Sequence, residues 1–460
     1  MIPRLLPGIL AVVLCGLAGR AAGQTGELHY EHLSEQLTAD IPDWPLDQVL
    51  ERLAQTTHWQ ILVEPEIERK VRVKFRDVPV GEGLRRLFGP LSFAYVPGTA
   101  GAVKLLVFSS DAKAATSLVP TIAPAIGAGP TRIEDELILR VKPGYQGDIE
   151  ELARSLGATI IGKLEEQNAY RLKFASAEAA QSARNRLATQ RDLQIQDNYR
   201  ISLPNDIDSQ SPLAIPSLGL TARPVGNDDQ IVVAVVDTPV QSEGTVLKDF
   251  LLPGISVAGE SNVSADTLSH GTSMATTILN GVAASADAAG GTAVRILPVD
   301  VYGSNESSSS FAVAQGIQAA ILGGADLVNL SLGGDGASPL VEELIRAGQA
   351  QGVVFIAAAG NEPVTTPTYP AAFPEVVAVT AMDRSGNVAP YANYGDFVDL
   401  VAPGLSFVPF QGQRYYVMGT SAAAANTTGQ AANLIVTQGL RGAALEQAIR
   451  AGVFQPSTTP

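Results

Sequence analysis

The segment Ile231-Val232-Val233-Ala234-Val235-Val236-Asp237 is a continuous apolar run of strand length that ends in a carboxylate. Similar apolar runs occupy residues 293–299, 327–332, 353–358 and 376–381. Stretches with helical patterns separate them at residues 271–282, 310–322, 339–349 and 421–438. Apolar strands that alternate with helices are typical of a parallel sheet buried on both faces. The sequence therefore predicts an α/β domain over residues 230–455, with a doubly wound, mostly parallel sheet and an active site beyond the C-terminal strand ends.

Two small α+β domains are expected ahead of this domain. In residues 38–110, Leu46, Val49, Leu50 and Leu53 have helical spacing, with Pro45 placed in the first turn of that helix. Residues 131–203 follow the strand-helix-strand-strand-helix-strand order of a ferredoxin-like domain. Residues 111–130 and 204–229 are rich in proline and small or polar residues, so we interpret them as linkers. The second linker is the expected place of a processing cut.

The first 23 residues predict an export signal. Arg4 precedes an apolar core at residues 5–17, and Ala21-Ala22-Gly23 is a small-residue cleavage site. Cys15, the only cysteine, lies inside this signal, and Leu14 is larger than the residue that usually precedes a lipid-anchored cysteine. The mature chain is expected to be exported and to lack cysteine, which excludes disulfides, cysteine nucleophiles and thiolate metal sites. No later stretch is apolar for long enough to predict a transmembrane helix.

Net charge limits the class of partner. The 460-residue chain has a formal net charge of -15. Nucleic acids and anionic membranes attract basic surfaces, so neither is expected as the main partner.

Four polar residues stand where a serine hydrolase needs them. Asp237 and Asn361 each follow an apolar strand run, and His270 precedes a helical stretch. Ser421 follows a strand-like run and a glycine at the start of an alanine-rich helix, where backbone N–H groups favour an oxyanion. His270 is expected to take the proton of Ser421, with Asp237 holding the imidazole and the Asn361 amide binding the oxyanion. A capping serine on a buried helix is the alternative for Ser421 alone.

The motifs around these residues resemble the subtilase family of serine proteases. They are Val236-Asp237-Thr238, Ser269-His270-Gly271-Thr272, Asn329-Leu330-Ser331-Leu332-Gly333-Gly334, Ala359-Gly360-Asn361 and Gly419-Thr420-Ser421. The resemblance implies a subtilisin-like fold and a secreted serine endopeptidase that forms an acyl-enzyme on Ser421. It also implies that Ser331, Leu332, Gly333 and Gly334 form an edge segment that pairs with an extended peptide substrate. No cofactor is required for this chemistry; calcium is common in the family, but no ligand cluster in the sequence compels it.

The two small domains also resemble known modules. Glu136 to Gly144 and Gln167 to Tyr170 are similar to the propeptides of secreted subtilases, which block the active site until they are cut. Ile41 to Leu50 resembles the short N-terminal domain of secretins and TonB-dependent receptors, which implies docking to an envelope protein. The expected location is therefore the periplasm, the outer-membrane surface or the extracellular space.

Departures from the family pattern keep other functions open. The family usually has glycine two residues after the catalytic aspartate, whereas this chain has Pro239, and alanines fill residues 422–425 after Ser421. Ser273 lies in a string similar to the nucleophile motif, but only Ser421 satisfies the family's order of catalytic residues. The alternatives are a weak or inactive peptide-binding protein on the same fold, and a protease dedicated to itself or to one envelope partner.

Overall fold

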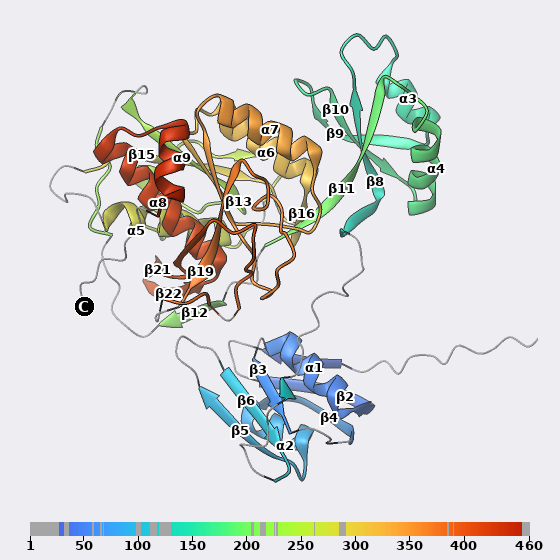
Figure 1. The fold of residues 1–460 in the computed structure, drawn as a ribbon, viewed down its shortest axis with the longest axis vertical. Helices are drawn as coiled ribbons and strands as arrows, with labels where there is room; N and C mark the ends of the chain where they lie inside the picture. Colours follow the sequence, from blue (N-terminus) through green and yellow to red (C-terminus); the bar gives the residue numbers. More distant parts are fainter. Residues whose placement is uncertain are drawn as a thin grey trace, which may run out of the picture. The chain divides into compact units, whose positions relative to one another are not determined.

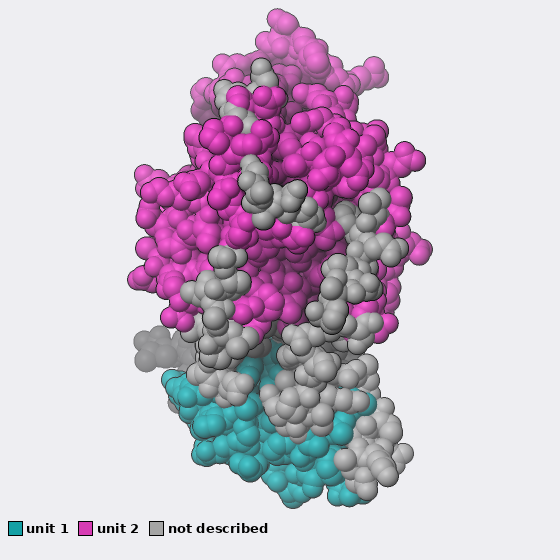
Figure 2. All heavy atoms as spheres, turned by 90° about the vertical axis from the view of Figure 1, so that its left-hand side faces the viewer, with its two compact units in different colours: residues 1–122 teal, residues 123–460 magenta. Residues whose placement is uncertain are grey.

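The computed structural model describes residues 27–31, 36–57, 59–64, 67, 69–97, 103–110, 117–118, 130–203, 207–211, 218–224, 226, 229–261, 263–284, 291–383, 386–389 and 391–452. They belong to two compact units, residues 1–122 and 123–460, which Figure 2 shows in different colours. No helix in the described ranges is long and apolar enough to cross a membrane. The predicted export signal lies outside these ranges.

The described residues of the first unit form two small sheets and two helices (Figure 1). One antiparallel sheet has the order β1-β2-β4, with β1 at Glu27–Glu31, β2 at Gln36–Pro45 and β4 at Lys70–Pro79. The other has the order β5-β6-β3-β7, with β5 at Ser92–Pro97, β6 at Val103–Phe108, β3 at Gln60–Val63 and β7 at Ser117–Leu118. The helices are α1 (Leu46–Thr57) and α2 (Val80–Phe88).

The predicted helix of the first unit is confirmed, but its start differs. Leu46, Val49, Leu50 and Leu53 are at most 2% exposed, as their spacing predicts. Pro45 was predicted in the first turn of this helix and instead ends β2, where it pairs with Lys70. The fixed φ of proline suits the end of a strand as well as it suits a helical first turn.

The second unit begins with the predicted ferredoxin-like domain. Its elements are β8 (Arg132–Val141), α3 (Ile149–Ser155), β9 (Ala158–Leu164), β10 (Ala169–Phe174), α4 (Ala177–Leu187) and β11 (Leu193–Ser202). The strands form an antiparallel sheet in the order β11-β8-β10-β9. The short strand β16 (Ser307–Ser309) of the following domain extends this sheet by pairing with β11.

The larger part of the second unit is built on a seven-stranded sheet in which every pair is parallel. Its order is β14-β15-β13-β17-β18-β19-β20, which confirms the predicted doubly wound α/β fold. The strands are β14 (Ile255–Ser256), β15 (Val294–Asp300), β13 (Ile231–Asp237), β17 (Leu327–Leu330), β18 (Val354–Ala358), β19 (Val376–Met382) and β20 (Leu400–Pro403).

Helices cover both faces of this sheet and fix the switch point of its topology. One apolar core joins the sheet to α5 (His270–Ala283), α8 (Thr420–Gln438) and α9 (Gly442–Arg450). The other joins it to α6 (Ser310–Leu322) and α7 (Pro339–Ala350). The chain winds from β13 through α5 to β15, and then through α6 to β17 on the other side of β13. Ligand sites of such sheets lie where the strand order reverses, here at the C-terminal end of β13.

A hairpin leads into α8. It consists of β21 (Leu405–Phe410) and β22 (Gln413–Met418), and β22 ends two residues before α8 begins. A third strand, β12 (Ile207–Ser211), pairs with the other edge of β22. This strand falls in the stretch predicted as a linker, and its sequence Ile-Asp-Ser-Gln-Ser has little strand patterning of its own.

Candidate active site

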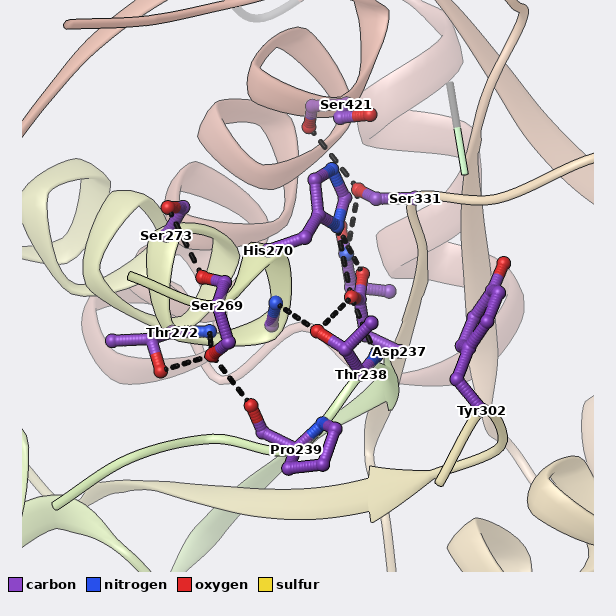
Figure 3. A network of polar contacts seen from close by, with 12 residues as sticks. Asp237, Thr238, Pro239, Ser269, His270, Thr272, Ser273, Tyr302, Ser331 and Ser421 are labelled. Carbon is purple, nitrogen blue, oxygen red and sulfur yellow. Dashed lines mark hydrogen bonds and ion pairs between the residues drawn. The ribbon is translucent and has the colours of Figure 1, made fainter. Parts of the chain in front are cut away.

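Asp237 and His270 meet at the switch point of the sheet. Asp237 is the last residue of β13 and is fully buried, and His270 is the first residue of α5. The Nδ1 atom of His270 lies 2.8 Å from Oδ1 and 2.9 Å from Oδ2 of Asp237. Figure 3 shows the imidazole between this carboxylate and Ser421, with its second ring nitrogen on the Ser421 side. A carboxylate on Nδ1 fixes the ring orientation and favours the tautomer with a proton on that nitrogen.

The loop after Asp237 ties the aspartate to α5. The backbone N–H of Thr238 donates to Oδ1 of Asp237 at 2.7 Å, and the Thr238 hydroxyl accepts from the Gly271 N–H at 2.8 Å. Ser269 caps α5 and donates its hydroxyl to the carbonyl of Pro239 at 2.6 Å. Residues 237–243, all described, have no positive φ, so the loop follows a path that accepts Pro239. Sequence reasoning gave Thr238 no role, and its only signal was its place next to Asp237.

Ser421 lies in the first turn of α8, behind Gly419 and Thr420. The helix continues without interruption through alanines 422–425, each 0% exposed, so the alanine run is compatible with the fold. Small side chains let α8 pack closely; a Cβ on Gly429, for example, would lie 2.3 Å from the carbonyl oxygen of Ile278 in α5. The Ser421 hydroxyl is buried and has no hydrogen-bond partner in the described part of the chain. A buried hydroxyl that makes no structural bond is available for chemistry, which argues against a capping role.

Asn361 is brought to the start of the same helix. It follows β18 and Gly360, whose φ of 108° is a conformation that favours glycine. Oδ1 of Asn361 accepts from the Thr420 N–H at 2.9 Å, and the Thr420 hydroxyl accepts from the Gly360 N–H at 3.1 Å. These two bonds orient the amide beside Ser421, with its NH₂ group as the donor side. Thr420 is a second positioning residue that sequence reasoning missed.

Ser331 connects the predicted substrate-binding segment to α8. Its hydroxyl donates to the backbone carbonyl of Ser421 at 3.2 Å and accepts from Nδ2 of Asn329 at 2.9 Å. Leu332 is buried in the core, whereas Gly333 and Gly334 bond to neighbouring segments through their backbones. The predicted edge segment 331–334 therefore lies next to the predicted nucleophile.

Tyr302, which Figure 3 shows beside Asp237, is fully buried and has no partner for its hydroxyl in the described ranges. Burial, and then the negative charge of Asp237, raise the pKa of this hydroxyl well above its usual value. Tyr302 therefore stays neutral next to the carboxylate.

A cleft of about 320 Å³ lies beside Asn361 and the predicted edge segment 331–334. Its lining includes Asn361, Gly333 and Gly334, and also Ser202 and Leu203 from the end of the ferredoxin-like domain. Two acidic residues, Asp335 and Glu362, line it as well. Burial, and then the charge of Asp335, raise the pKa of the Glu362 carboxyl above its ordinary value.

The ferredoxin-like domain is bonded to this edge of the site. The N–H of Ser202 donates to the Gly333 carbonyl at 2.9 Å, and the N–H of Gly333 donates back at 3.2 Å. Asn198, 0% exposed, accepts from the Phe311 N–H and the Ser310 hydroxyl at the start of α6, both at 3.1 Å. It also donates to the buried carboxylate of Glu136 at 2.7 Å. Extended chain from this domain thus lies where the sequence predicts substrate to pair.

No group of three or more His, Cys, Asp or Glu side chains in the described ranges is arranged to hold a metal ion.

The subtilase family profile (Peptidase S8) matches residues 228–450. A thermophilic serine proteinase from Bacillus sp. (strain AK1) is 35% identical over 225 residues, which are 47% of this chain and 55% of that protein. Thermitase from Thermoactinomyces vulgaris is 32% identical over 47% of this chain and 78% of its own length. Subtilisin DY from Bacillus licheniformis is 32% identical over 45% of this chain and 76% of its own length. The chain thus spans little more than half of the first relative and about three quarters of the other two.

One solved structure extends the comparison to the fold. Fervidolysin from Fervidobacterium pennivorans, described as a keratinolytic enzyme related to subtilisin, matches with a TM-score of 0.54 at 22% identity. The match covers 70% of this chain and 57% of that chain. Its share of this chain exceeds the 45–47% that the three sequence relatives cover, so the shared fold reaches beyond the region of sequence identity. By its profile, its relatives and its fold, this chain belongs to the subtilase family.

Proposed function

We propose that this protein is an exported serine endopeptidase that hydrolyses peptide bonds through an acyl-enzyme on Ser421. The contact of His270 Nδ1 with both carboxylate oxygens of Asp237, 2.8 and 2.9 Å away, is the observation that carries the proposal. A histidine oriented in this way can act as a base through its second ring nitrogen, and Ser421 lies on that side of the ring. The unbonded, buried hydroxyl of Ser421 supports the same assignment.

In the proposed reaction, His270 removes the proton of Ser421 as its oxygen attacks the substrate carbonyl carbon. Asp237 stabilises the imidazolium that forms and remains ionised itself. The imidazolium then gives its proton to the leaving amine as the peptide bond breaks. Water, activated by the same imidazole, hydrolyses the ester and restores Ser421. Every proton is accounted for by His270, so the chemistry needs no cofactor.

The oxyanion of the tetrahedral intermediate is proposed to bind at the N-terminus of α8. The NH₂ group of Asn361 and the backbone N–H of Ser421 are the donors. The bond from Thr420 N–H to Asn361 Oδ1 holds the amide before reaction, so no reorganisation is needed when charge develops.

The extended substrate is proposed to pair with the Ser331–Gly334 segment upstream of the bond that is cut. Residues 131–203 are proposed to act as a propeptide, and Ser202 on Gly333 is the contact that supports this role. Processing then separates this domain from the subtilase domain by a cut after it. The first unit is proposed to dock to an envelope protein, in the periplasm, at the outer membrane or outside the cell.

Labelling with a serine-directed fluorophosphonate, together with casein hydrolysis, tests the proposal. Wild-type protein should react and cleave casein, and Ser421→Ala should do neither and should keep its propeptide attached. A processed wild-type chain that neither reacts nor cleaves would instead favour the peptide-binding alternative. Self-cleavage without activity on casein would favour a protease dedicated to itself or to one partner.

A further inference from the structure

The chain is paired as a strand on both sides of Ser421. Upstream, Ser202 forms its two backbone bonds with Gly333. Downstream, Ile207 pairs with Met418, and the antiparallel register continues to Ser211 opposite Arg414. Met418 ends β22 only three positions before Ser421. The N-terminal end of β12 is therefore nearest to Ser421, and the strand runs away from it. The part of a substrate that follows the cut bond would run in the same direction.

We propose that Ile207–Ser211 is an occluding strand that fills the leaving-group side of the active site. The inference rests on the proposed protease function and adds a second inhibitory segment to the propeptide. The sheet order β12-β22-β21 gives β22 a partner on each edge. A protein substrate needs the β12 edge of β22 for the residues that follow its cut bond, because β21 occupies the other edge. Substrate and β12 therefore compete for one set of backbone bonds.

A cut between Leu203 and Ile207 has different consequences for the two flanking strands. The upstream strand leaves with residues 131–203, which are then held only by non-covalent contacts. The downstream strand stays covalently attached, because the chain continues to Ala222, which bridges to Thr292. The tether from Ser211 to Ala222 has ten residues between its ends, so it can reach at most roughly 40 Å when fully extended. Such tethers give effective concentrations of about 1 mM.

This effective concentration predicts which substrates β12 protects from hydrolysis. When the substrate residues after the cut bond bind β22 as tightly as β12 does, a protein substrate at about 10 μM occupies this edge about 100-fold less often than the tethered strand at about 1 mM. A peptide p-nitroanilide has no residues after its cut bond, so it does not compete with β12. Occlusion by β12 is intramolecular and survives dilution, whereas inhibition by the released propeptide disappears on dilution.

Replacement of Ile207–Ser211 in the full chain by Gly-Ser-Gly-Ser-Gly tests the proposal, with Thr-Val-Thr-Val-Thr as a strand-forming control of equal length. After processing and dilution, the glycine-serine variant should raise kcat/KM about tenfold or more for a peptide with five residues after the cut bond. The value for a p-nitroanilide should not change, and the control should behave as wild type. The proposal would be overturned by equal effects on both substrates or by no effect on either. It would also be overturned if dilution alone raised the kcat/KM of wild type for the extended peptide to that of the glycine-serine variant.

A second measurement is independent of activity. In the uncut Ser421→Ala chain, backbone amides of β22 that face β12 should be protected from hydrogen exchange. The glycine-serine replacement should speed their exchange about tenfold or more, and the control should not. Unchanged exchange would overturn the occluding strand. Absence of labelling and hydrolysis in every chain would instead overturn the protease function and leave this readout intact.

Discussion

Gly271 lies where α5 passes the backbone of Thr238, and an alanine there tests what holds His270 against Asp237. A Cβ atom at residue 271 would lie 2.1 Å from the Thr238 carbonyl oxygen, whereas ordinary contact begins at 3.4 Å. The neighbour is backbone, so no change of rotamer relieves the clash, and the two segments have to separate by roughly 1 Å. Overpacking of this kind costs about 1–3 kcal/mol of folding free energy. Misplacement of a reacting group by about 1 Å costs about 10²-fold in rate.

We therefore expect Gly271→Ala to lower kcat about 100-fold and the thermal unfolding midpoint by about 5 °C. Hydrolysis of a peptide p-nitroanilide and calorimetry measure the two effects. Gly81 is the matched control, because it is also the second residue of its helix and a Cβ there meets nothing within 4 Å. Gly81→Ala should leave kcat unchanged. A Gly271→Ala protein with wild-type kcat and midpoint would refute the idea that this close approach positions His270.

Three further outcomes are expected. Asn361→Ala should lower kcat about 10²–10³-fold, a magnitude established for the oxyanion asparagine of this family and not worked out from this structure. An unchanged kcat in turnover assays would show that Asn361 does not bind the oxyanion. Asn198→Ala removes the acceptor of the Phe311 N–H and the Ser310 hydroxyl at the start of α6, a loss of about 2 kcal/mol, so propeptide inhibition should weaken about 30-fold in dilution assays. The raised pKa of Glu362 means that its carboxylate forms only at higher pH than usual, so kcat/KM for lysine relative to leucine substrates should rise through that pH range. Glu362→Gln should flatten this ratio, and a ratio that rises equally in the variant would assign the effect to another group.

The central sheet could be predicted because its strands are buried on both faces. All seven residues of β13 are buried, so a continuous apolar run was the pattern that the fold required. The ferredoxin-like order could be predicted for a related reason, because Leu137, Leu139, Leu172 and Phe174 alternate toward one core. Asp237, His270, Asn361 and Ser421 were predicted as site residues from their places at strand and helix ends and from the family motifs.

The remaining parts depend on partners far away in the sequence. β12 has a polar sequence, and its pairing is supplied by the open edge of β22, about two hundred residues later. Asn198 bonds to α6 and to Glu136 at once, and no local pattern encodes such a junction. Thr238 and Thr420 act through bonds that exist only after β13, α5, β18 and α8 have assembled. The strand-like run before Ser421 is part of β22, but α9 and β21 were missed, because short segments near the sheet edge have weak periodicity.

The most direct test compares fluorophosphonate labelling of three full-length chains: wild type, Ser421→Ala and Ser273→Ala. Ser273 is fully buried and donates its hydroxyl to the Ser269 carbonyl at 3.3 Å, so it is the matched serine without a proposed role in chemistry. Labelling of wild type and Ser273→Ala, with none of Ser421→Ala, is the result that the account predicts. Undiminished labelling of Ser421→Ala would contradict it, because the nucleophile would then be another residue.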